Sequence, residues 1–484
     1  MLLNKKHVYL LFFSIILIST AMHFKHFNKE LIGIHVWRQT QTQSTITNFY
    51  EEDMNIFNPH RNERGNTDGI FRMEFPLLQW LVACTYKVFG NSIAITRVFM
   101  FVIGLLSVAG MYKLIKNMFN NTTIAIIAAW AFNFSPSFYY YTINPIPDNL
   151  SLCTAIWGLT LFIKWLSTSK NYLLYLSALF FSIATLCKLP FAVYFSFPLS
   201  YLFFNYLKNK QIKTLLLNSF PFLMALLIPA IWYYKVIPTW HGNGVVQGVF
   251  DNNPGGSQLV DYLQHNLIST LPELLLNYAS LPFFVLGLYF IIKYKAYQHK
   301  LFLPFVVLSS LVLFYFFFEI NMIAKIHDYY LFPFYPLLFI IVSYGIYNLL
   351  KLNNKIATAF VYIALLVLPF TCYLRMKNRW NIESPGFNSD LLKYKNELRN
   401  AVPSNALCIV GKDESRFISF YYIDKKGWSF ASDSLTKEDI ESKIKKGAQY
   451  LYSDSKQIDS QFVALNHIDR LILEKGSIKV FKLK

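Results

Sequence analysis

Long apolar stretches recur along the first three-quarters of this chain and constrain its fold more than any other feature. Each is nearly free of charge and approaches the roughly 20 residues that a helix needs to cross a hydrocarbon core. They lie at 8–22, 98–112, 121–134, 150–163, 171–187, 189–204, 214–232, 276–292, 301–318, 329–350 and 356–374. Only 15% of the residues are charged, whereas a soluble protein carries about a quarter. The sequence therefore predicts a polytopic α-helical membrane protein with about eleven transmembrane helices.

Lysines mark every second connection between these stretches. The pattern runs through Lys5 and Lys6; Lys113 and Lys116; Lys164 and Lys170; Lys208, Lys210 and Lys213; Lys293, Lys295 and Lys300; and Lys351 and Lys355. Short connections rich in lysine face the cytoplasm. We therefore expect a multi-pass protein of the cell (inner) membrane, with a cytoplasmic N-terminus and residues 377–484 outside. The net charge of +18 reflects these anchors, because the basic residues form no stripe that would bind nucleic acid.

The first apolar run has two interpretations. Lys5 and Lys6 before Val8–Ile18 resemble the start of a secretory signal peptide. The small-residue cleavage pattern is poor, however, since Ser19-Thr20-Ala21 continues directly into Met22. An uncleaved first span is the favoured interpretation.

The chain divides by composition into two expected domains. Residues 1–376 form a transmembrane domain that carries a long outer loop, 23–97, and residues 377–484 form a small extracytoplasmic α/β domain. In the second domain, strands are expected at 406–410, 417–423, 427–430 and 450–452. A helix from about 435 to 446 would be capped by Thr436, and 470–473 with 479–483 would close a hairpin. Such a domain could bind an acceptor or a partner protein, or simply cap the bundle.

Polar residues concentrate in two segments of the outer loop. The first contains His35, Trp37, Arg38 and Gln39, and the second contains Asp68 and leads through Glu74 into an apolar helix. Arg38 offers a planar guanidinium suited to a phosphate, and Trp37 could stack on a sugar or anchor at the interface. A loop of this length is usually functional, although a solvated amphipathic loop would show similar residues.

Three further outer connections carry isolated ionisable groups. Asp148 begins a span, where a carboxylate either serves function or only caps a helix. Lys188 lies in a very short apolar turn, which is costly unless the amine reaches water or an anion. The last connection contains Lys325 and His327-Asp328-Tyr329. Cations, carboxylates and histidines thus converge on one membrane face, as expected for chemistry on a phosphate-bearing lipid.

These motifs together resemble a known family. His-Val-Trp-Arg-Gln at 35–39, Glu74-Phe-Pro-Leu, Pro147-Asp148-Asn149 and His327-Asp328-Tyr329-Tyr330 are similar to motifs of the C-type (GT-C) membrane glycosyltransferases. The nearest likeness is to the bacterial branch of protein O-mannosyltransferases and lipid A aminoarabinose transferases, over residues 1–376. The resemblance implies inverting transfer of a sugar from a polyprenyl-phosphate donor to a lipid, glycan or protein acceptor. It also implies a first-loop carboxylate as base.

The base is where this sequence departs from the family. Members commonly carry an aspartate shortly after the first span, whereas this chain has His35 there, with only Glu30 upstream. Glu74 is then the first candidate base and Asp68 the next, and His35 could serve instead. By resemblance, Lys188, Lys325 and Arg38 would meet the donor phosphate.

No motif specifies a cofactor. The five cysteines have neither paired nor metal-ligating spacing, so no metal ligands are assigned, and the question of a divalent metal ion stays open. Two rival functions share the expected donor: a transporter or flippase of lipid-linked glycans, and a polymerase or ligase of such glycans. Against a transporter, the two halves of the chain show no repeat.

Overall fold

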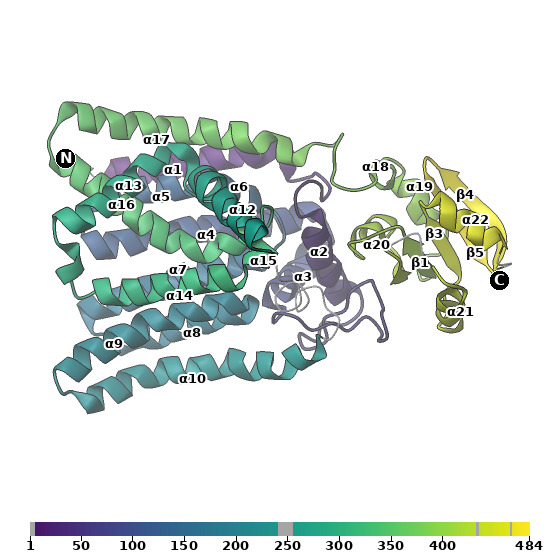
Figure 1. Cartoon of the computed structure of the whole chain (residues 1–484), viewed down its shortest axis with the longest axis horizontal. Coiled ribbons are helices and arrows are strands. Elements are labelled where there is room, and N and C mark those ends of the chain that lie inside the picture. The colour runs from purple at the N-terminus through teal and green to yellow at the C-terminus, as the bar shows by residue number, and fades with distance from the viewer. Residues whose placement is uncertain (1–4, 241–254, 432–434, 465–466) are drawn as a thin grey trace. The chain divides into compact units, whose positions relative to one another are not determined.

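The computed structural model describes residues 5–240, 255–431, 435–464 and 467–484, and most of them are helical (Figure 1). The chain forms two compact units. The first comprises Met1–Phe27, Met73–Phe75 and Thr96–Asn378, and the second comprises Asn28–Arg72, Pro76–Ile95 and Arg379–Lys484. Most of the loop 23–97 thus belongs to the same unit as the C-terminal segment, a grouping that the change in composition along the chain does not reveal.

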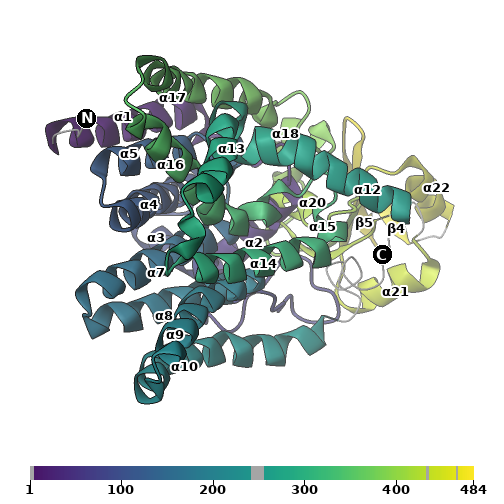
Figure 2. The ribbon, with the colours of Figure 1, turned by 60° about the vertical axis from the view of Figure 1, so that its left-hand side comes forward.

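The first unit is a bundle of apolar helices. Its long members lie side by side, from α17 along one edge to α10 along the opposite edge (Figures 1 and 2). The helices are α1 (Lys5–His23), α4 (Ile93–Phe119), α5 (Thr122–Asn133), α6 (Pro136–Tyr141), α7 (Asp148–Thr168), α8 (Asn171–Cys187), η2 (Leu189–Phe195), α9 (Ser196–Lys208), α10 (Ile212–Val236), α12 (Gly256–His265), η5 (Asn266–Leu275), α13 (Asn277–Lys293), α14 (Phe302–Phe318), α15 (Ile320–Ile323), η7 (Asp328–Phe334), α16 (Tyr335–Lys351) and α17 (Lys355–Met376).

The predicted class of polytopic helical membrane protein is confirmed, but the count of eleven spans is not. Among the described residues, six helices are long and apolar enough to cross a membrane, or seven if the bent pair Gly256–Leu275 and Asn277–Lys293 is one span. Shorter apolar helices occur at Leu77–Phe89, Thr122–Asn133, Asn171–Cys187 and Phe302–Phe318. Several predicted spans therefore coincide with helices that are shorter than a full crossing.

Glycines allow the closest approach between helices of the bundle. A Cβ atom on Gly345 of α16 would lie 2.0 Å from the Phe283 carbonyl oxygen, and one on Gly287 of α13 would lie 2.2 Å from the Ile341 carbonyl oxygen. Only hydrogen fits at these two positions. Small residues let helix backbones pack closely in membranes, where burial of apolar surface gives no net drive between helices.

The second unit contains a five-stranded sheet in the order β2-β1-β3-β5-β4. Strands β1 (Leu407–Gly411), β2 (Lys426–Ser429) and β3 (Tyr450–Ser453) are parallel, whereas β4 (Ile468–Lys475) and β5 (Ile478–Leu483) form the expected antiparallel hairpin. The expected cap also forms, because the Thr436 side chain accepts a hydrogen bond from the Asp439 N–H at the start of α21 (Lys437–Lys445). The remaining helices of this part are α18 (Ser389–Lys393), α19 (Lys395–Asn400), α20 (Ile418–Ile423) and α22 (Lys456–Ala464).

One predicted strand is a helix. Residues 417–423 were expected to be extended, but Ile418–Ile423 forms α20. The Ser415 hydroxyl oxygen accepts from the N–H groups of Phe417 and Ile418, and the Asp413 carboxylate accepts from the Ser419 N–H. These polar groups satisfy the free donors of a first helical turn. A short continuous apolar run does not by itself distinguish a buried strand from a buried helix.

The loop 23–97 supplies two helices to this second unit and pairs with its edge strand β2. The helices are α2 (Val36–Glu51) and α3 (Leu77–Phe89). The loop also pairs with the sheet, because Arg64 N–H donates to the Gly427 carbonyl and Gly427 N–H donates to that of Asn62. Glu30 pairs with Lys395 and accepts a 2.8 Å hydrogen bond from the Tyr421 hydroxyl. The loop thus covers the outer edge of β2, which would otherwise expose unpaired backbone groups.

Candidate functional site

The centre of the candidate site in the bundle is an ion pair between Lys188 and Asp148. The Lys188 Nζ lies 3.4 Å from Asp148 Oδ1, and the two side chains are only 15% and 2% exposed. Asp148 is the first residue of α7, and Lys188 follows the last residue of α8, so the packing of these two helices brings the charges together. Helix capping alone does not describe Asp148, because its carboxylate has a cationic partner.

Two tyrosines of η7 also lie beside this lysine. The Lys188 Nζ lies 4.6 Å from the ring centroid of Tyr330 and 5.7 Å from that of Tyr329. Aromatic faces attract a cation, most strongly where water is excluded. The amine is therefore held by one carboxylate and two rings, which offset the cost of placing a charge among apolar helices.

Asp328, the residue before these tyrosines, is held by two hydroxyl groups of α6. Its Oδ2 accepts a 2.9 Å hydrogen bond from Ser137 Oγ, and its Oδ1 accepts a 2.6 Å bond from the Tyr141 hydroxyl. The Tyr141 ring also lies edge-on to that of Tyr329, with centroids 5.6 Å apart. The structure thus brings together Asp148, Lys188, Asp328 and Tyr329 from three distant parts of the sequence.

His327 lies beside the same tyrosines. Its ring centroid is 5.9 Å from that of Tyr329 and 5.6 Å from that of Tyr330, and its Nδ1 contacts the Met322 carbonyl. Burial lowers the pKa of His327, while Asp328 raises it and Lys188 lowers it further. A depressed pKa keeps the imidazole in its neutral form at neutral pH.

Glu319 is a carboxylate that sequence reasoning did not select. It follows the last residue of α14, and burial raises its pKa while Lys188 opposes that shift. The Tyr315 hydroxyl, one turn earlier, donates a 2.9 Å hydrogen bond to the Tyr330 carbonyl and so joins this helix to the lysine site. The signal in the sequence was a single carboxylate ending an otherwise uncharged apolar run. Among the described residues, no three His, Cys, Asp or Glu side chains are grouped to hold a metal ion.

Lys325 has different surroundings from Lys188. Its Nζ lies 2.5 Å from Asp261 Oδ2 of α12, and both side chains are exposed, at 43% and 53%. A lysine in an exposed pair is well solvated and contributes little net stability. Of the two lysines expected to bind a phosphate, only Lys188 is largely buried and held by neighbouring side chains, so it is the stronger candidate.

Glu74 lies in the short segment Met73–Phe75, which packs with the bundle. The Trp232 indole N–H of α10 donates a 3.1 Å hydrogen bond to the Met73 carbonyl, and the Phe75 N–H donates a 2.9 Å bond to the Leu186 carbonyl. The segment is thus held on both sides of Glu74, whose side chain is 9% exposed. Helix α3 begins only at Leu77, with Pro76 as its N-cap residue.

The residues expected near the first span lie in the second unit. His35 adopts a left-handed conformation (φ 58°) directly before α2, and its carbonyl accepts from the N–H groups of Arg38 and Gln39. The Arg38 Nη1 donates a 2.6 Å hydrogen bond to Gln41 Oε1, and the Gln39 amide donates to the Ile34 carbonyl. His35, Arg38 and Gln39 are all buried, so the polar start of α2 is shielded from water.

Trp37 and Asp68 have other surroundings. Trp37 packs against the apolar cluster that contains Val36, Leu391 and Leu398, which belongs to the core of the second unit. Asp68 lies in an exposed turn, where its carbonyl accepts hydrogen bonds from His60 and Arg64. An exposed carboxylate in a turn is less suited than Glu74 to act as a base in a site that excludes water.

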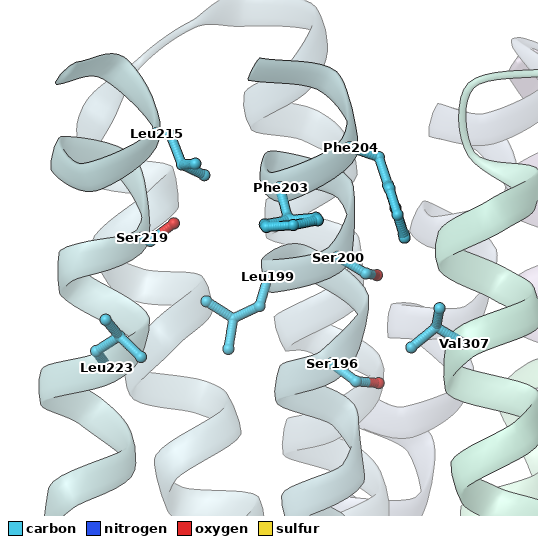
Figure 3. Close-up of a pocket in the computed structure, with 9 residues that line it drawn as sticks. All are labelled: Ser196, Leu199, Ser200, Phe203, Phe204, Leu215, Ser219, Leu223 and Val307. Atoms are coloured by element: carbon cyan, nitrogen blue, oxygen red, sulfur yellow. The ribbon is translucent and has the colours of Figure 1, made fainter. Parts of the chain in front are cut away.

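A cavity of about 500 Å³ opens between α9, α10 and α14 (Figure 3). Figure 3 shows side chains from the three helices directed into it. Its lining residues are Ser196, Leu199, Ser200, Phe203, Phe204, Leu215, Ser219, Leu223 and Val307. None of these nine is ionisable, so the cavity suits an apolar ligand and is separate from the charged site around Lys188.

Sequence comparison connects part of the bundle to a family of enzymes. Residues 74–234 match the profile of the family described as dolichyl-phosphate-mannose-protein mannosyltransferase. The matched region begins at Glu74 and includes Asp148 and Lys188. No curated protein sequence matches the chain.

Solved structures share the fold over nearly the whole chain. ArnT from Cupriavidus metallidurans bound to undecaprenyl phosphate superimposes with a TM-score of 0.69 at 12% identity, covering 99% of this chain and 98% of that one. The archaeal oligosaccharyltransferase AglB from Archaeoglobus fulgidus, in complex with an inhibitory peptide and a dolichol-phosphate, gives 0.60 at 13% identity, covering 96% and 71%. The expected resemblance to C-type membrane glycosyltransferases is thereby confirmed at the level of the fold.

Proposed function

We propose that this chain is a glycosyltransferase that moves a sugar, with inversion, from a polyprenyl-phosphate donor to a lipid, glycan or protein acceptor. The observation that carries the proposal is Lys188, a buried amine held by Asp148 and the rings of Tyr329 and Tyr330. The shared fold adds support, because one neighbour was solved with undecaprenyl phosphate and another with a dolichol-phosphate. Both hexosyl and pentosyl transfer are compatible with this chemistry.

Lys188 is suited to bind the phosphate of such a donor. An ammonium group is a compact cation with three N–H donors, a chemistry suited to phosphate oxygens. As the bond between the sugar and the phosphate oxygen breaks, negative charge grows on the phosphate. A fixed cation in a site of low polarity stabilises that charge strongly. Arg38 and Lys325 are the further cations proposed to meet the phosphate.

Glu74 is the proposed base. The acceptor hydroxyl attacks the anomeric carbon, the electrons of the breaking bond move to the phosphate oxygen, and the hydroxyl proton passes to the Glu74 carboxylate. Backbone hydrogen bonds on both sides of Glu74 hold it in position, which a general base requires. Asp68 and His35 are the alternatives, and Trp37, Gln39, Asp148, His327, Asp328 and Tyr329 are proposed to contact or orient the substrates.

The apolar cavity offers a surface for the isoprenoid part of the donor. Helix α9, which lines it, begins at Ser196, eight residues after Lys188. A lipid with its phosphate at Lys188 would have to extend its chain along apolar helices, because the hydrocarbon gains nothing from polar surroundings. The cavity in Figure 3 supplies such a surface.

Incubation of the purified chain in lipid nanodiscs with polyprenyl-phosphate sugars and mixed acceptors tests the proposal. We expect release of free polyprenyl phosphate together with a glycosylated acceptor, because transfer breaks the bond between sugar and phosphate. A transporter or flippase would move the intact donor between leaflets and release none. Movement without release, in protein that binds the donor, would contradict the enzymatic function.

We further propose that the chain lies in the cell (inner) membrane with its N-terminus inside and residues 377–484 outside. Single cysteines introduced as Lys412→Cys and Lys437→Cys are expected to react with a membrane-impermeant thiol reagent added outside intact cells. A cysteine at Lys210, in the lysine-bearing turn between α9 and α10, is the matched control and should react only after the membrane is opened. Protection of positions 412 and 437 in intact cells would overturn the orientation.

A further inference from the structure

Arg97 is a fully buried arginine that the proposed chemistry does not use. It lies near the start of α4, within the bundle, and its side chain is 0% exposed. Its Nη1 donates a 2.6 Å hydrogen bond to Asn144 Oδ1 and contacts the Ile143 carbonyl at 3.4 Å. A buried guanidinium is expensive among apolar helices unless it serves a particular arrangement.

The partner of Arg97 belongs to a turn between α6 and α7. In this turn the Asn144 side chain donates to the Tyr140 carbonyl, at 2.9 Å. The Asn149 side chain in turn donates to the carbonyls of Tyr141, at 2.7 Å, and Asn144, at 3.2 Å. The turn is thus tied at both ends by amide side chains.

Helix α4 contacts the same turn at a second point. A Cβ atom on Gly104 would lie 2.4 Å from Thr142 Cγ2, so a larger residue there would displace the Thr142 side chain. Arg97 and Gly104 are seven residues apart and therefore lie on one face of α4. One helix face holds the turn through a charged hydrogen bond and, two turns along, through close packing.

The two ends of the turn carry the polar groups of the lysine site. Tyr141, just before it, donates its hydroxyl to Asp328, and Asp148, just after it, pairs with Lys188. We infer that Arg97 is a positioning residue: through Asn144 it fixes the turn 142–147, which presents Asp148 to Lys188 and Tyr141 to Asp328. The structure shows the contacts of Arg97, Tyr141 and Asp148 without a substrate. That this positioning serves donor binding rests on the proposed function.

The test measures how strongly Lys188 is held by Asp148. The full chain in detergent is treated with an amine-reactive acylating reagent at fixed pH, and modification of the peptide containing Lys188 is followed by mass spectrometry. Arg97→Gln removes the charge and is expected to raise the rate of Lys188 acylation about tenfold. This factor corresponds to a loss of roughly 1.4 kcal/mol in the interaction between Lys188 and Asp148. Asp148→Asn should give the same increase, because it removes the partner directly. Arg97→Lys keeps a charged donor and should stay near the wild-type rate.

Asn277→Ala is the matched control. Asn277 is also a buried amide in the bundle, donating to the carbonyls of Phe134 and Leu368, but it lies outside the turn. The Asn277→Ala substitution should lower the melting temperature without changing the rate of Lys188 acylation. If Arg97→Gln does not fold, Asn144→Ala is expected to show the same rate increase.

Two outcomes separate this inference from the proposed function. An unchanged Lys188 rate in folded Arg97→Gln or Asn144→Ala would overturn the positioning role. A rate increase in a protein whose wild type neither binds polyprenyl phosphate nor transfers sugar would support the positioning role and refute the proposed function. Where both hold, Arg97→Gln should also weaken binding of polyprenyl phosphate about tenfold.

Discussion

Replacement of Glu74 by glutamine is expected to lower the turnover number about 10²–10⁴-fold, the usual contribution of a general base. Glutamine keeps the size of the side chain and its hydrogen-bonding capacity but cannot accept the acceptor's proton. The donor KM should change little, because the proposed phosphate contact is Lys188 and not Glu74. The measurement is release of polyprenyl phosphate at saturating donor, per folded molecule.

Asp68→Asn is the matched control for this substitution. Asp68 is the other carboxylate proposed for the role, and it lies in an exposed turn of the same loop. We expect its replacement to leave turnover near wild type. Helix α3 begins at Leu77 with Pro76 as N-cap, so Glu74→Gln should change stability by less than about 1 kcal/mol. Full turnover in Glu74→Gln would remove this residue from the mechanism and leave Asp68 or His35 as the base.

Replacement of Lys188 by glutamine is expected to have the largest effect on donor binding. We predict that affinity for polyprenyl phosphate falls about 100-fold, since a buried charge pair lost from a binding site costs on the order of 2–5 kcal/mol. The protein should also lose stability, because Asp148 remains buried without its cation, a change that costs about 3–5 kcal/mol. Isothermal calorimetry and thermal unfolding in the same detergent measure the two effects.

The double variant Lys188→Gln/Asp148→Asn separates binding from stability. Removing both charges leaves no buried unpaired ion, so the melting temperature should recover toward wild type. Donor binding should stay lost, because the cation is still absent. If binding recovers together with stability, Lys188 supports the fold and does not bind the phosphate. Lys325→Gln removes the charge of a second proposed phosphate contact and should weaken donor binding less than Lys188→Gln does, since Lys325 is exposed and paired with Asp261.

The sequence by itself determined the class of the protein. Apolar runs with lysines between them require a membrane-spanning helical bundle, because backbone polar groups in lipid must bond within their own helix. Local chemistry also determined parts of the C-terminal segment. Thr436 caps α21, and Gly476 turns the β4–β5 hairpin with a φ of 60° that favours glycine. Both features depend only on residues close in sequence.

Isolated charges were also visible from the sequence as candidates. A lysine in an apolar turn, such as Lys188, and a carboxylate at a helix start, such as Asp148, each require an explanation. Their roles were not visible, because each has an ordinary local alternative, namely a snorkelling anchor or a helix cap. The number of spans stayed undetermined for a related reason, since a short apolar run is equally suited to a buried helix.

The tertiary structure decided which of these charges act together. Lys188 and Asp148 are forty residues apart, and the packing of α7 on α8 makes them a pair. Asp328 reaches Ser137 and Tyr141 across nearly two hundred residues. In the structure, residues 418–423 also form a helix, and the loop 23–97 pairs with the C-terminal sheet. Such contacts depend on long-range packing, whose free energy comes from many distant neighbours, and no local pattern in the chain encodes them.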